Sequence, residues 1–232
     1  MNFLKTSWVI HMKIKKFLTP KYWWIPVISM FLINIAAYSG SKLLTDSGHH
    51  FDISLPIDFA IPFIPAFIII YILSYLQWVG GYGLVAIESK EVCYRVISSE
   101  IIAKLICFVI FMLIPTTLER PSTEGYGIFG AITNLIYSMD TPTTLFPSVH
   151  CLESWILFRT AHKITRYKRW LVPLYFVFAL LVFASVLFVK QHLIVDIPAA
   201  ILVGEIGLFL GKKLKAERIF IKINKKFLRV SS

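Results

Sequence analysis

Residues 170–189 read WLVPLYFVFALLVFASVLFV, a run of twenty residues without a charged side chain. Because an α-helix rises about 1.5 Å per residue, such a run spans about 30 Å, the thickness of the hydrocarbon core of a bilayer. Apolar runs of this length are typical of transmembrane helices rather than of helices in soluble domains. The run therefore predicts that the chain crosses a membrane.

The composition of the whole chain agrees with this prediction. Hydrophobic residues make up 57% of the 232 residues and charged residues only 16%, against about 25% in soluble domains. Disorder is excluded, because disordered chains are poor in apolar residues and rich in charge. The net charge of +11 is spread between long apolar runs rather than over a polar domain, so we expect no nucleic-acid partner.

Six apolar runs predict six transmembrane helices, although the fourth run is short for a complete crossing. The runs are Tyr22–Leu44, Ile61–Ile87, Val96–Thr117, Val149–Arg159, Trp170–Val189 and Leu193–Leu210. The predicted fold is all-α, a polytopic membrane protein whose helices form one bundle. We expect a six-helix domain over 22–211, a basic cytoplasmic or interfacial segment over 1–21 without a cleavable signal peptide, and a basic cytoplasmic tail over 212–232.

The basic residues predict the orientation of the bundle. With six spans, twenty of the 24 Lys and Arg residues fall on the side of the two termini, three fall on the other side, and Lys104 falls within the third span. Because loops rich in Lys and Arg stay in the cytoplasm, both termini are predicted to be cytoplasmic in the cell membrane. The basic tail also offers charges to the anionic headgroups of membrane lipids.

Three polar clusters fall on the opposite, non-cytoplasmic side of this topology. They are Glu119-Arg120-Pro121, Phe146–His150 and Lys190–Asp196. Since each adjoins a span end at the same membrane face, residues distant in sequence are expected to meet at headgroup depth. The three cysteines lie far apart without a CxxC pair, so neither a disulfide framework nor a metal site is predicted.

His192 and Asp196 are four residues apart, a spacing that puts both side chains on one face of a helix. The carboxylate can hold the proton on one imidazole nitrogen and leave the other nitrogen available as an acceptor or nucleophile. A carboxylate inside an apolar run costs about 2.5–3.5 kcal/mol on insertion scales, which favours a functional role. A buried pair that only fixes helix packing is the alternative.

Ser148 and His150 follow Pro147, a pattern that is typical of a helix start. The N–H groups of a helix N-terminus bind phosphate well, and His150 at that position can donate a proton to a leaving oxygen. A plain cap followed by an interfacial histidine is the alternative. Glu153, three residues further on, is expected either to orient the imidazole of His150 or to serve in packing.

Arg120 and Lys190 are two of the three basic residues on a side that otherwise lacks them. A guanidinium is a permanently charged planar fork that matches phosphate oxygens, although basic side chains also act as interfacial anchors. Taken together, the three clusters predict a phosphate-binding site with a nucleophile and an acid.

At these residues the chain resembles the phosphatidic acid phosphatase type 2 superfamily of membrane lipid phosphatases and phosphotransferases. The family has three motifs: Lys-x6-Arg-Pro, Pro-Ser-x-His and Ser-Arg-x5-His-x3-Asp. The chain contains Arg120-Pro121, all of Pro147–His150, and Ser185, His192 and Asp196 at the distances of the third motif. The resemblance extends from the third to the sixth predicted span.

The resemblance implies that His192 is the nucleophile that forms a phosphohistidine, that Asp196 orients it, and that His150 protonates the leaving group. It implies a reaction without a metal or another cofactor. The residues then expected to bind phosphate are Arg120, Ser148, Lys190 and Ser185.

Two positions depart from the family pattern. Leu113 stands where the first motif has lysine, and Val186 stands where the third motif has arginine. Lys190 can replace one of the missing charges. Without the first-motif lysine, the chain looks more like the branch of inositol-phosphorylceramide and sphingomyelin synthases, which transfer a phospho-headgroup to a lipid alcohol.

We therefore expect a lipid phosphatase of the outer face that acts on a phosphomonoester or diphosphate, with a phospholipid or polyprenyl (di)phosphate as substrate. One alternative is a lipid phosphotransferase with an alcohol acceptor. The other is a non-catalytic membrane or transport protein on the same fold, which the intraspan residues Glu100, Lys104 and Glu205 would support. Glu100 and Lys104, four residues apart, are also typical of a structural ion pair.

Gly207 and Gly211 form a GxxxG step in the sixth predicted span. Small residues at this spacing let two helix backbones approach closely. The step predicts close packing of this helix against a neighbour.

Overall fold

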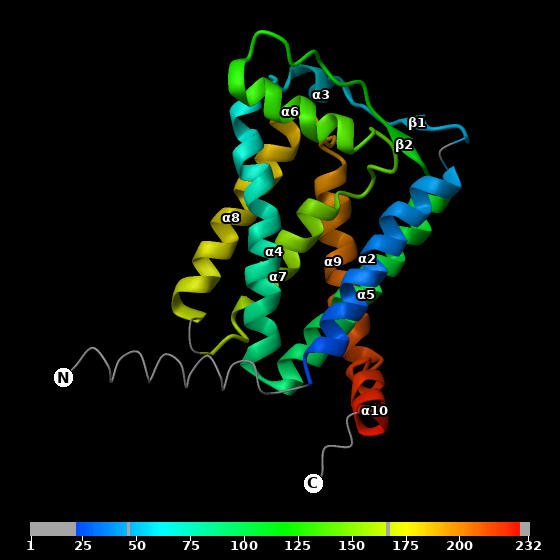
Figure 1. Cartoon of the computed structure of the whole chain (residues 1–232), viewed down its shortest axis with the longest axis vertical. Helices are drawn as coiled ribbons and strands as arrows, with labels where there is room; N and C mark the ends of the chain where they lie inside the picture. The colour runs from blue at the N-terminus through cyan, green and yellow to red at the C-terminus, as the bar shows by residue number, and fades with distance from the viewer. Residues whose placement is uncertain (1–21, 46, 166–167, 228–232) are drawn as a thin grey trace, which may run out of the picture.

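The computed structural model describes residues 22–45, 47–165 and 168–227, and helices account for almost all of the regular structure in these ranges (Figure 1). The longer helices are α2 (Trp24–Thr45), α4 (Ile68–Glu88), α5 (Lys90–Leu113), α8 (Lys168–Phe188) and α9 (Asp196–Lys213). The shorter elements are β1 (Phe51–Asp52), α3 (Pro56–Ala60), η1 (Pro65–Phe67), β2 (Thr116–Thr117), α6 (Gly127–Met139), α7 (Val149–Ala161) and α10 (Glu217–Phe227). The basic segment predicted over 1–21 lies outside the described residues, as does the end of the predicted tail.

Four helical segments have the length and apolar composition of membrane spans: Trp24–Thr45, Pro65–Glu88, Lys90–Leu113 and Arg169–Phe188. They confirm the predicted helical class and support the prediction of a membrane protein. The predicted fourth and sixth spans, α7 and α9, differ from these four. Helix α7 has 13 residues, which is about 20 Å of helix, and α9 carries acidic and basic residues. The count of six spans therefore stays a prediction.

Helix α7 is short because the chain enters the bundle as a loop before this helix begins. The N–H groups of Leu145 and Phe146 donate to Thr116 Oγ1 at 3.0 and 2.9 Å, and Thr143 forms a bridge with Thr117. Non-helical backbone at membrane depth is tolerated where its polar groups are paired and where it lines a cavity. Both conditions hold here, because residues 144, 145 and 147 line a cavity.

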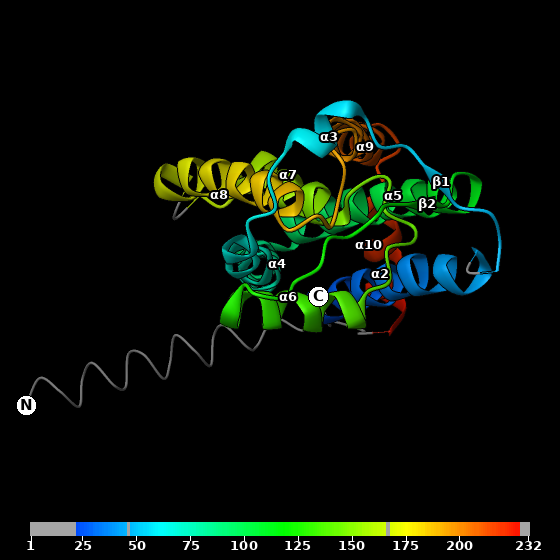
Figure 2. The same ribbon diagram turned by 90° about the horizontal axis from the view of Figure 1, so that it is seen from above.

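The described residues include three α-helices that the hydropathy pattern does not predict: the short α3, α6 and α10. Helix α6 lies across one end of the bundle (Figure 2), and α10 follows α9 within the predicted tail. In addition, α9 begins at Asp196 rather than at Leu193, because residues 189–195 form a turn. Proline limits the second span: Pro65 begins η1, so the membrane-length segment starts four residues later than predicted.

Helix α5 lies between its neighbours, with α2 and α9 packed along it and α4 also in contact (Figures 1 and 2). Helix α9 approaches α5 closely at Gly207 and Gly211. A Cβ atom on Gly207 would lie 2.7 Å from Ala103 Cβ, and one on Gly211 would lie 2.1 Å from Ser99 Oγ. The predicted role of the GxxxG step in close packing is confirmed.

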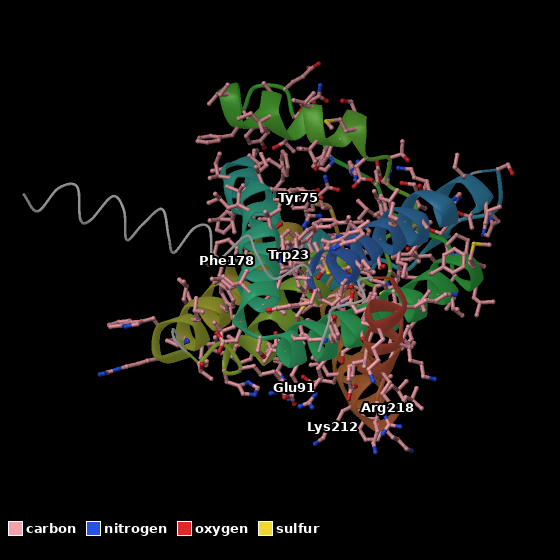
Figure 3. The ribbon with its side chains drawn as sticks, turned by 60° about the horizontal axis from the view of Figure 1, so that its bottom comes forward. Trp23, Tyr75, Glu91, Phe178, Lys212 and Arg218 are labelled. Atoms are coloured by element: carbon pink, nitrogen blue, oxygen red, sulfur yellow. The ribbon has the colours of Figure 1, made fainter. Side chains whose placement is uncertain are left out.

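The loops gather at two ends of the bundle (Figure 1). We call the end formed by residues 47–64, 114–126 and 189–195 the site end, and the end formed by residues 88–90, 161–165 and 213–217 the tail end. Figure 3 shows Glu91, Lys212 and Arg218 together at the tail end. The described loops thus divide between the two ends as the topology prediction requires, whereas the orientation of these ends in a membrane stays a prediction.

A buried ionic cluster joins three helices in the interior of the bundle. Lys104 Nζ of α5 lies 2.6 Å from Glu153 Oε1 of α7 and 3.9 Å from Glu100 Oε1 of its own helix. The Tyr82 hydroxyl of α4 donates to Glu153 Oε2. All four side chains are buried. The predicted ion pair of Glu100 with Lys104 is confirmed, and Glu153 completes the cluster.

Glu205, the third intraspan residue singled out from the sequence, has a different environment. Its carboxylate is partly exposed and lies 2.5 Å from Arg159 Nε, and it also accepts a hydrogen bond from Trp155 Nε1 at 2.9 Å. Glu205 therefore links α9 to α7 at the edge of the bundle.

The close contact between α5 and α9 can be tested by a substitution that adds one methyl group. Gly207→Ala should lower the free energy of unfolding by about 1–3 kcal/mol, because the added Cβ overpacks the contact with Ala103. Gly80→Ala is the matched control, since a Cβ there meets nothing within 4 Å; it should leave stability unchanged or raise it by up to about 1 kcal/mol. Thermal unfolding of both variants in detergent measures the difference, and equal midpoints would contradict the packing described here.

Candidate functional site

The turn over 189–195 carries the predicted nucleophile. Helix α8 ends in a Schellman motif, in which Gln191 N–H donates to Val186 O at 2.9 Å and Lys190 N–H donates to Leu187 O at 3.1 Å. Lys190 has a φ of 49°, and glycine usually occupies this left-handed position. A side chain there costs roughly 1–2 kcal/mol. A lysine at this position therefore indicates a use for its side chain.

Asp196 is fully buried, and its carboxylate reaches back over this turn. Asp196 Oδ2 accepts from His192 Nδ1 and from Leu193 N–H, each at 3.0 Å. The predicted pairing is confirmed, but its geometric reason was wrong: His192 lies in the turn before α9 and not on the helix. Within the described part of the chain, His192 Nε2 has no hydrogen-bond partner, so this nitrogen is available as an acceptor.

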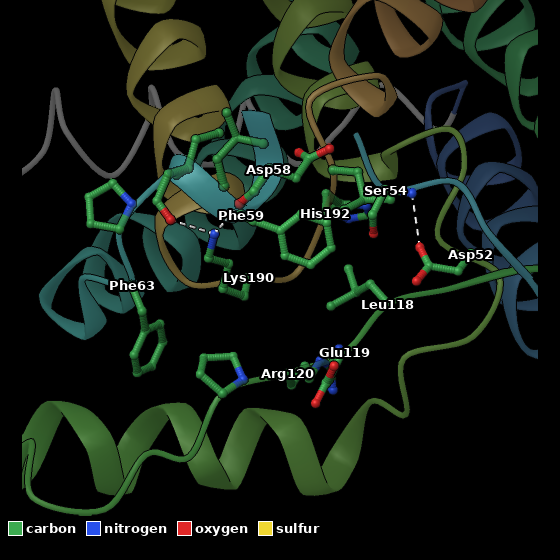
Figure 4. Close-up of a pocket in the computed structure, with 15 residues that line it drawn as sticks. Asp52, Ser54, Asp58, Phe59, Phe63, Leu118, Glu119, Arg120, Lys190 and His192 are labelled. Atoms are coloured by element: carbon green, nitrogen blue, oxygen red, sulfur yellow. Dashed lines mark hydrogen bonds between the residues drawn. The ribbon is translucent and has the colours of Figure 1, made fainter. Parts of the chain in front are cut away.

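His192 lines a polar cavity of about 460 Å³ at the site end (Figure 4). Arg120 and Lys190, two of the residues predicted to bind phosphate, line the same cavity. The structure thus brings together side chains from two of the three sequence clusters. Carboxylates line the cavity as well, so it presents both signs of charge: Asp52, Asp58 and Glu119.

The guanidinium of Arg120 is held by polar groups on two sides. One terminal nitrogen donates to Gln191 Oε1 at 2.5 Å, and the other donates to the carbonyl oxygens of Asp140 and Tyr137 at 2.5 and 3.4 Å. The guanidinium carbon also lies 4.4 Å from the centre of the Tyr137 ring. Burial lowers the pKa of Arg120, which Asp140 partly offsets, but arginine keeps its charge in proteins. The site therefore holds a fixed positive charge.

Lys190 ties α3 to the turn that carries His192. Its ammonium group donates to the carbonyl oxygens of Asp58 and Ile61 at 2.7 and 2.6 Å (Figure 4). Asp58 Oδ1 in turn accepts from Ile194 N–H at 2.7 Å. Because an ammonium group has three donors, one N–H of Lys190 is left for the cavity.

His150 lies deeper, level with the first turns of α4, and only 7% of it is exposed. Its ring centre is 4.1 Å from that of Tyr71, 5.1 Å from that of Tyr75 and 4.8 Å from that of Trp78. Ser74 Oγ donates to Tyr71 O at 2.6 Å and lies 3.0 Å from His150 Nδ1. Since the serine proton is already used, Nδ1 is the donor in that contact. His150 Nε2, 3.4 Å from the Tyr75 hydroxyl, is then the nitrogen that can exchange a proton with a ligand.

Glu153 does not orient His150, so that expectation was wrong. On α7 the two side chains face different neighbours: His150 contacts α4, and Glu153 pairs with Lys104 of α5. The packing role considered for Glu153 is the one observed. The predicted cap is confirmed, because Ser148 is the N-cap of α7 and its hydroxyl accepts from Cys151 N–H at 3.3 Å.

A second cavity, of about 300 Å³, lies between α2, α4, α6 and α7 and is mostly apolar. Both histidines line it, and their ring centres are 6.2 Å apart. At this separation one bound group can lie within about 3.5 Å of both rings. Among the described residues, His192 alone lines both this cavity and the polar one. His192 therefore stands at the border between a charged and an apolar space.

Ser185 and Ser148 do not line either cavity. Ser185 is fully buried in α8, and its hydroxyl donates to Val182 O at 2.8 Å. Ser148 is also fully buried, with its hydroxyl used as the helix cap. Its neighbours Pro147 and Val149 line the apolar cavity, so Ser148 supports this cavity from behind, and neither serine side chain shares a cavity with Arg120 and Lys190.

Several residues of the site were not found from the sequence. Asp58 is an acid inside the apolar stretch LPIDFAIPF, and the argument applied to Asp196 would have selected it. Tyr71, Tyr75 and Trp78 follow helical spacing, but this spacing does not reveal that a histidine from α7 packs against them. Gln191 carries no signal in the sequence, because its role depends on where Arg120 lies.

The chain matches no family model, no curated protein and no solved structure. In the described ranges, no three His, Cys, Asp or Glu side chains come together as metal ligands. The function is therefore argued from the geometry of the site.

The contact between His192 and Asp196 predicts the tautomer of the imidazole. Histidine labelled with nitrogen-15 should show His192 as the Nδ1–H form, because Asp196 accepts that proton. Asp196→Ala should give a mixture of tautomers, whereas Asp52→Ala should keep the Nδ1–H form, since Asp52 lines the same cavity but bonds Ser54. Long-range nitrogen–proton correlation spectra measure this. A dominant Nε2–H form in the unaltered protein would contradict the described geometry.

Proposed function

We propose that the chain is an integral membrane lipid phosphatase that hydrolyses a phosphomonoester or diphosphate of a lipid through a phosphohistidine on His192. The observation that carries the proposal is the environment of this one imidazole. Asp196 holds its Nδ1, its Nε2 has no partner among the described residues, and its ring lies where a cavity with two basic side chains meets an apolar one. An imidazole fixed in this way is an activated nucleophile.

The shape of the substrate follows from the two cavities. A phosphorylated lipid has a charged end and an apolar end joined at the phosphate ester. With its phosphate beside Arg120 and Lys190 and its apolar part in the second cavity, the ester bond lies next to His192. The likeness to the phosphatidic acid phosphatase type 2 superfamily, through Arg120-Pro121, Pro147–His150 and the His192–Asp196 spacing, supports the same chemistry.

In the first step, His192 Nε2 attacks phosphorus, an N–P bond forms and the bond from phosphorus to the lipid oxygen breaks. Arg120 and Lys190 stabilise the charge on the phosphoryl oxygens. The leaving oxygen takes a proton from His150 Nε2; a phosphomonoester then releases a lipid alcohol, and a diphosphate releases a lipid monophosphate. Asp196 stabilises the positive charge that develops on the imidazole of His192.

In the second step, water attacks the phosphohistidine. The N–P bond breaks, His192 is restored, and inorganic phosphate leaves. His150, which is neutral after the first step, takes up a proton from the attacking water and is thereby returned to its acid form. The two histidines need opposite protonation states at the start, so the rate should have a bell-shaped dependence on pH.

In the membrane, we propose that six helices cross the bilayer, with α7 completed by the loop over 140–148 and α9 by the turn over 189–195. The site end then faces the non-cytoplasmic side, and both termini are cytoplasmic. The distribution of Lys and Arg between the two ends supports this orientation.

Phosphotransfer to a lipid alcohol is the second candidate function. It is favoured by Leu113 and Val186, which replace two cations of the family pattern, and by the apolar cavity beside both histidines. An alcohol in that cavity would replace water in the second step. With a phosphate-labelled lipid substrate, a phosphatase releases labelled inorganic phosphate, whereas a transferase moves the label to an added lipid alcohol.

Substitution of the two histidines tests the proposed roles. With an activated aryl phosphate, whose leaving group needs no proton, His150→Ala should still form the covalent phosphoenzyme, because the acid is dispensable. His192→Ala should form none and should lose turnover, because the nucleophile is gone. Labelled substrate followed by an alkaline quench, in which phosphohistidine survives, measures the intermediate.

Two outcomes of this experiment would contradict the proposal. Label trapped in His192→Ala but not in His150→Ala would mean that the roles are reversed. Turnover that survives in both variants would mean that neither histidine acts on the substrate. Asp52→Ala serves as a control for an altered polar cavity with both histidines intact.

Cysteine labelling tests the proposed orientation. Ser122 is exposed at the site end and Lys213 is exposed at the tail end, whereas the three native cysteines are buried. Ser122→Cys should react with a membrane-impermeant maleimide in intact cells, and Lys213→Cys should react only after permeabilisation. The opposite pattern would show that the bundle is inverted.

A further inference from the structure

A groove of about 650 Å³ runs along the bundle from the tail end. Its walls come from α2, α5 and α10, with Ile33, Ile101 and Leu105 among the apolar residues that line it. The groove shares no lining residue with the two cavities beside His192, although Ile33 at its inner end precedes Asn34 and Ile35 of the apolar cavity. It is therefore a separate cavity from those around His192.

Basic side chains from one helical face line one end of the groove. Lys215, Arg218 and Lys222 all line it and are exposed. Their spacing of three and four residues puts them on one side of α10 and of the turn before it. Among the residues that the structure describes, these three have no ion-pair partner, and the described lining contains no acidic residue.

The fold of α10 fixes these charges in place. Phe220 is 5% exposed and packs on Tyr94 of α5, with ring centres 5.8 Å apart, and Asn224 donates to Tyr22 O at 3.3 Å. Burial of this face turns Arg218 and Lys222 toward the groove and toward solvent, and Figure 3 shows Arg218 at the tail end. The basic rim is therefore attached to the bundle and does not belong to a loose tail.

An unpaired polar group also faces the groove. Ser98 of α5 lines it and is 5% exposed, yet within the described residues its hydroxyl has no hydrogen-bond partner. Its neighbour Ser99 instead donates to Arg95 O at 2.9 Å, the usual arrangement for serine in a helix. A buried hydroxyl without a partner costs free energy, which points to a ligand that supplies an acceptor.

We infer that this groove binds an anionic phospholipid, with an acyl chain along α2 and α5 and the phosphate between the basic residues of α10. The combination of an apolar channel and a basic rim at the end of long apolar helices fits an amphiphile with a negative headgroup. An ester carbonyl of the lipid accepts from Ser98 Oγ. A soluble anion would use the basic rim but leave the apolar channel empty.

Native mass spectrometry of the full-length protein in detergent tests the site. Phosphatidylglycerol and phosphatidylcholine with the same acyl chains are titrated in separate experiments. The first phosphatidylglycerol should bind at least about tenfold more tightly, and Arg218→Gln with Lys222→Gln should weaken it about thirtyfold, since each basic residue near an anionic headgroup contributes roughly a fivefold factor. Phosphatidylcholine binding should change little.

The matched control is Lys212→Gln with Lys225→Gln, which removes the same charge at exposed positions outside the groove lining. It should keep the preference for phosphatidylglycerol. Ile102→Trp, which fills the apolar channel, should lose the first-bound lipid, and Ser98→Ala should weaken it less. Thermal unfolding of each variant in lipid-free detergent shows that the fold is intact.

Three results would overturn the inference. Equal binding of the two lipids would mean that the basic rim does not select for charge. Equal loss in both double variants would mean diffuse attraction to a basic surface. Displacement of the lipid by excess inorganic phosphate would mean a site for free anions. None of these readouts uses catalysis, so they are distinguishable from a failure of the proposed phosphatase activity.

Discussion

The geometry of the site end depends on one buried carboxylate. Asp196 holds the imidazole of His192, the N–H of Leu193 and the first turn of α9 together. A carboxylate in an apolar bundle costs several kcal/mol, and two hydrogen bonds and a helix N-terminus offset part of this cost. Among the described residues, Asp196 Oδ1 has no partner, so the charge is incompletely compensated at rest. The charge of Asp196 is better compensated when the imidazole of His192 becomes positive. In the proposed mechanism this favours the phosphohistidine over the resting state.

The sequence predicts the parts of this protein that follow from burial along one segment, and it fails where two distant segments meet. Long apolar runs predict α2, α4, α5 and α8, because a helix in an apolar medium satisfies its own backbone. The predicted bounds of α2 and α8 are within two residues of those observed, whereas the starts of α4 and α5 are wrong by seven and six residues. The pairing of His192 with Asp196 was predicted, although a turn produces it rather than a helix face. Helix α6 was not predicted, because it lies in the segment between α5 and α7 and is held by contacts with η1 and α4. Helix α10 was not predicted, because the basic residues over 212–232 indicate a cytoplasmic tail. The stretch ERIFIKINKKF nevertheless has the pattern of an amphipathic helix. The partners of Arg120 and His150 depend on tertiary placement, which spacing does not contain.

The ionic cluster around Lys104 bears on the alternative of a transport protein. Glu100, Lys104 and Glu153 lie on two helices in the middle of the bundle and are almost completely buried. None of them lines any of the three cavities described above. A transport pathway would require access to these groups from both faces of the membrane, whereas their described contacts are with one another and with Tyr82. Its two carboxylates and one ammonium group tie α5 to α7, the helix that carries His150.

The two ends of the bundle have a similar arrangement of charge and apolar surface but differ in chemistry. Each combines basic side chains with an apolar space: Arg120 and Lys190 at the site end, and Arg218 and Lys222 at the tail end. The difference lies in what stands at the border between charge and apolar surface. At the tail end the border holds only a serine hydroxyl, which can bind a lipid but cannot attack it without a base. At the site end the border holds the imidazole of His192, whose Nε2 has no partner in the part of the chain that the structure describes. The phosphate ester of any phosphorylated lipid lies at its own polar–apolar border. Under the proposed phosphatase function, matching the two borders would bring the reactive bond to His192 without recognition of a particular chain or headgroup.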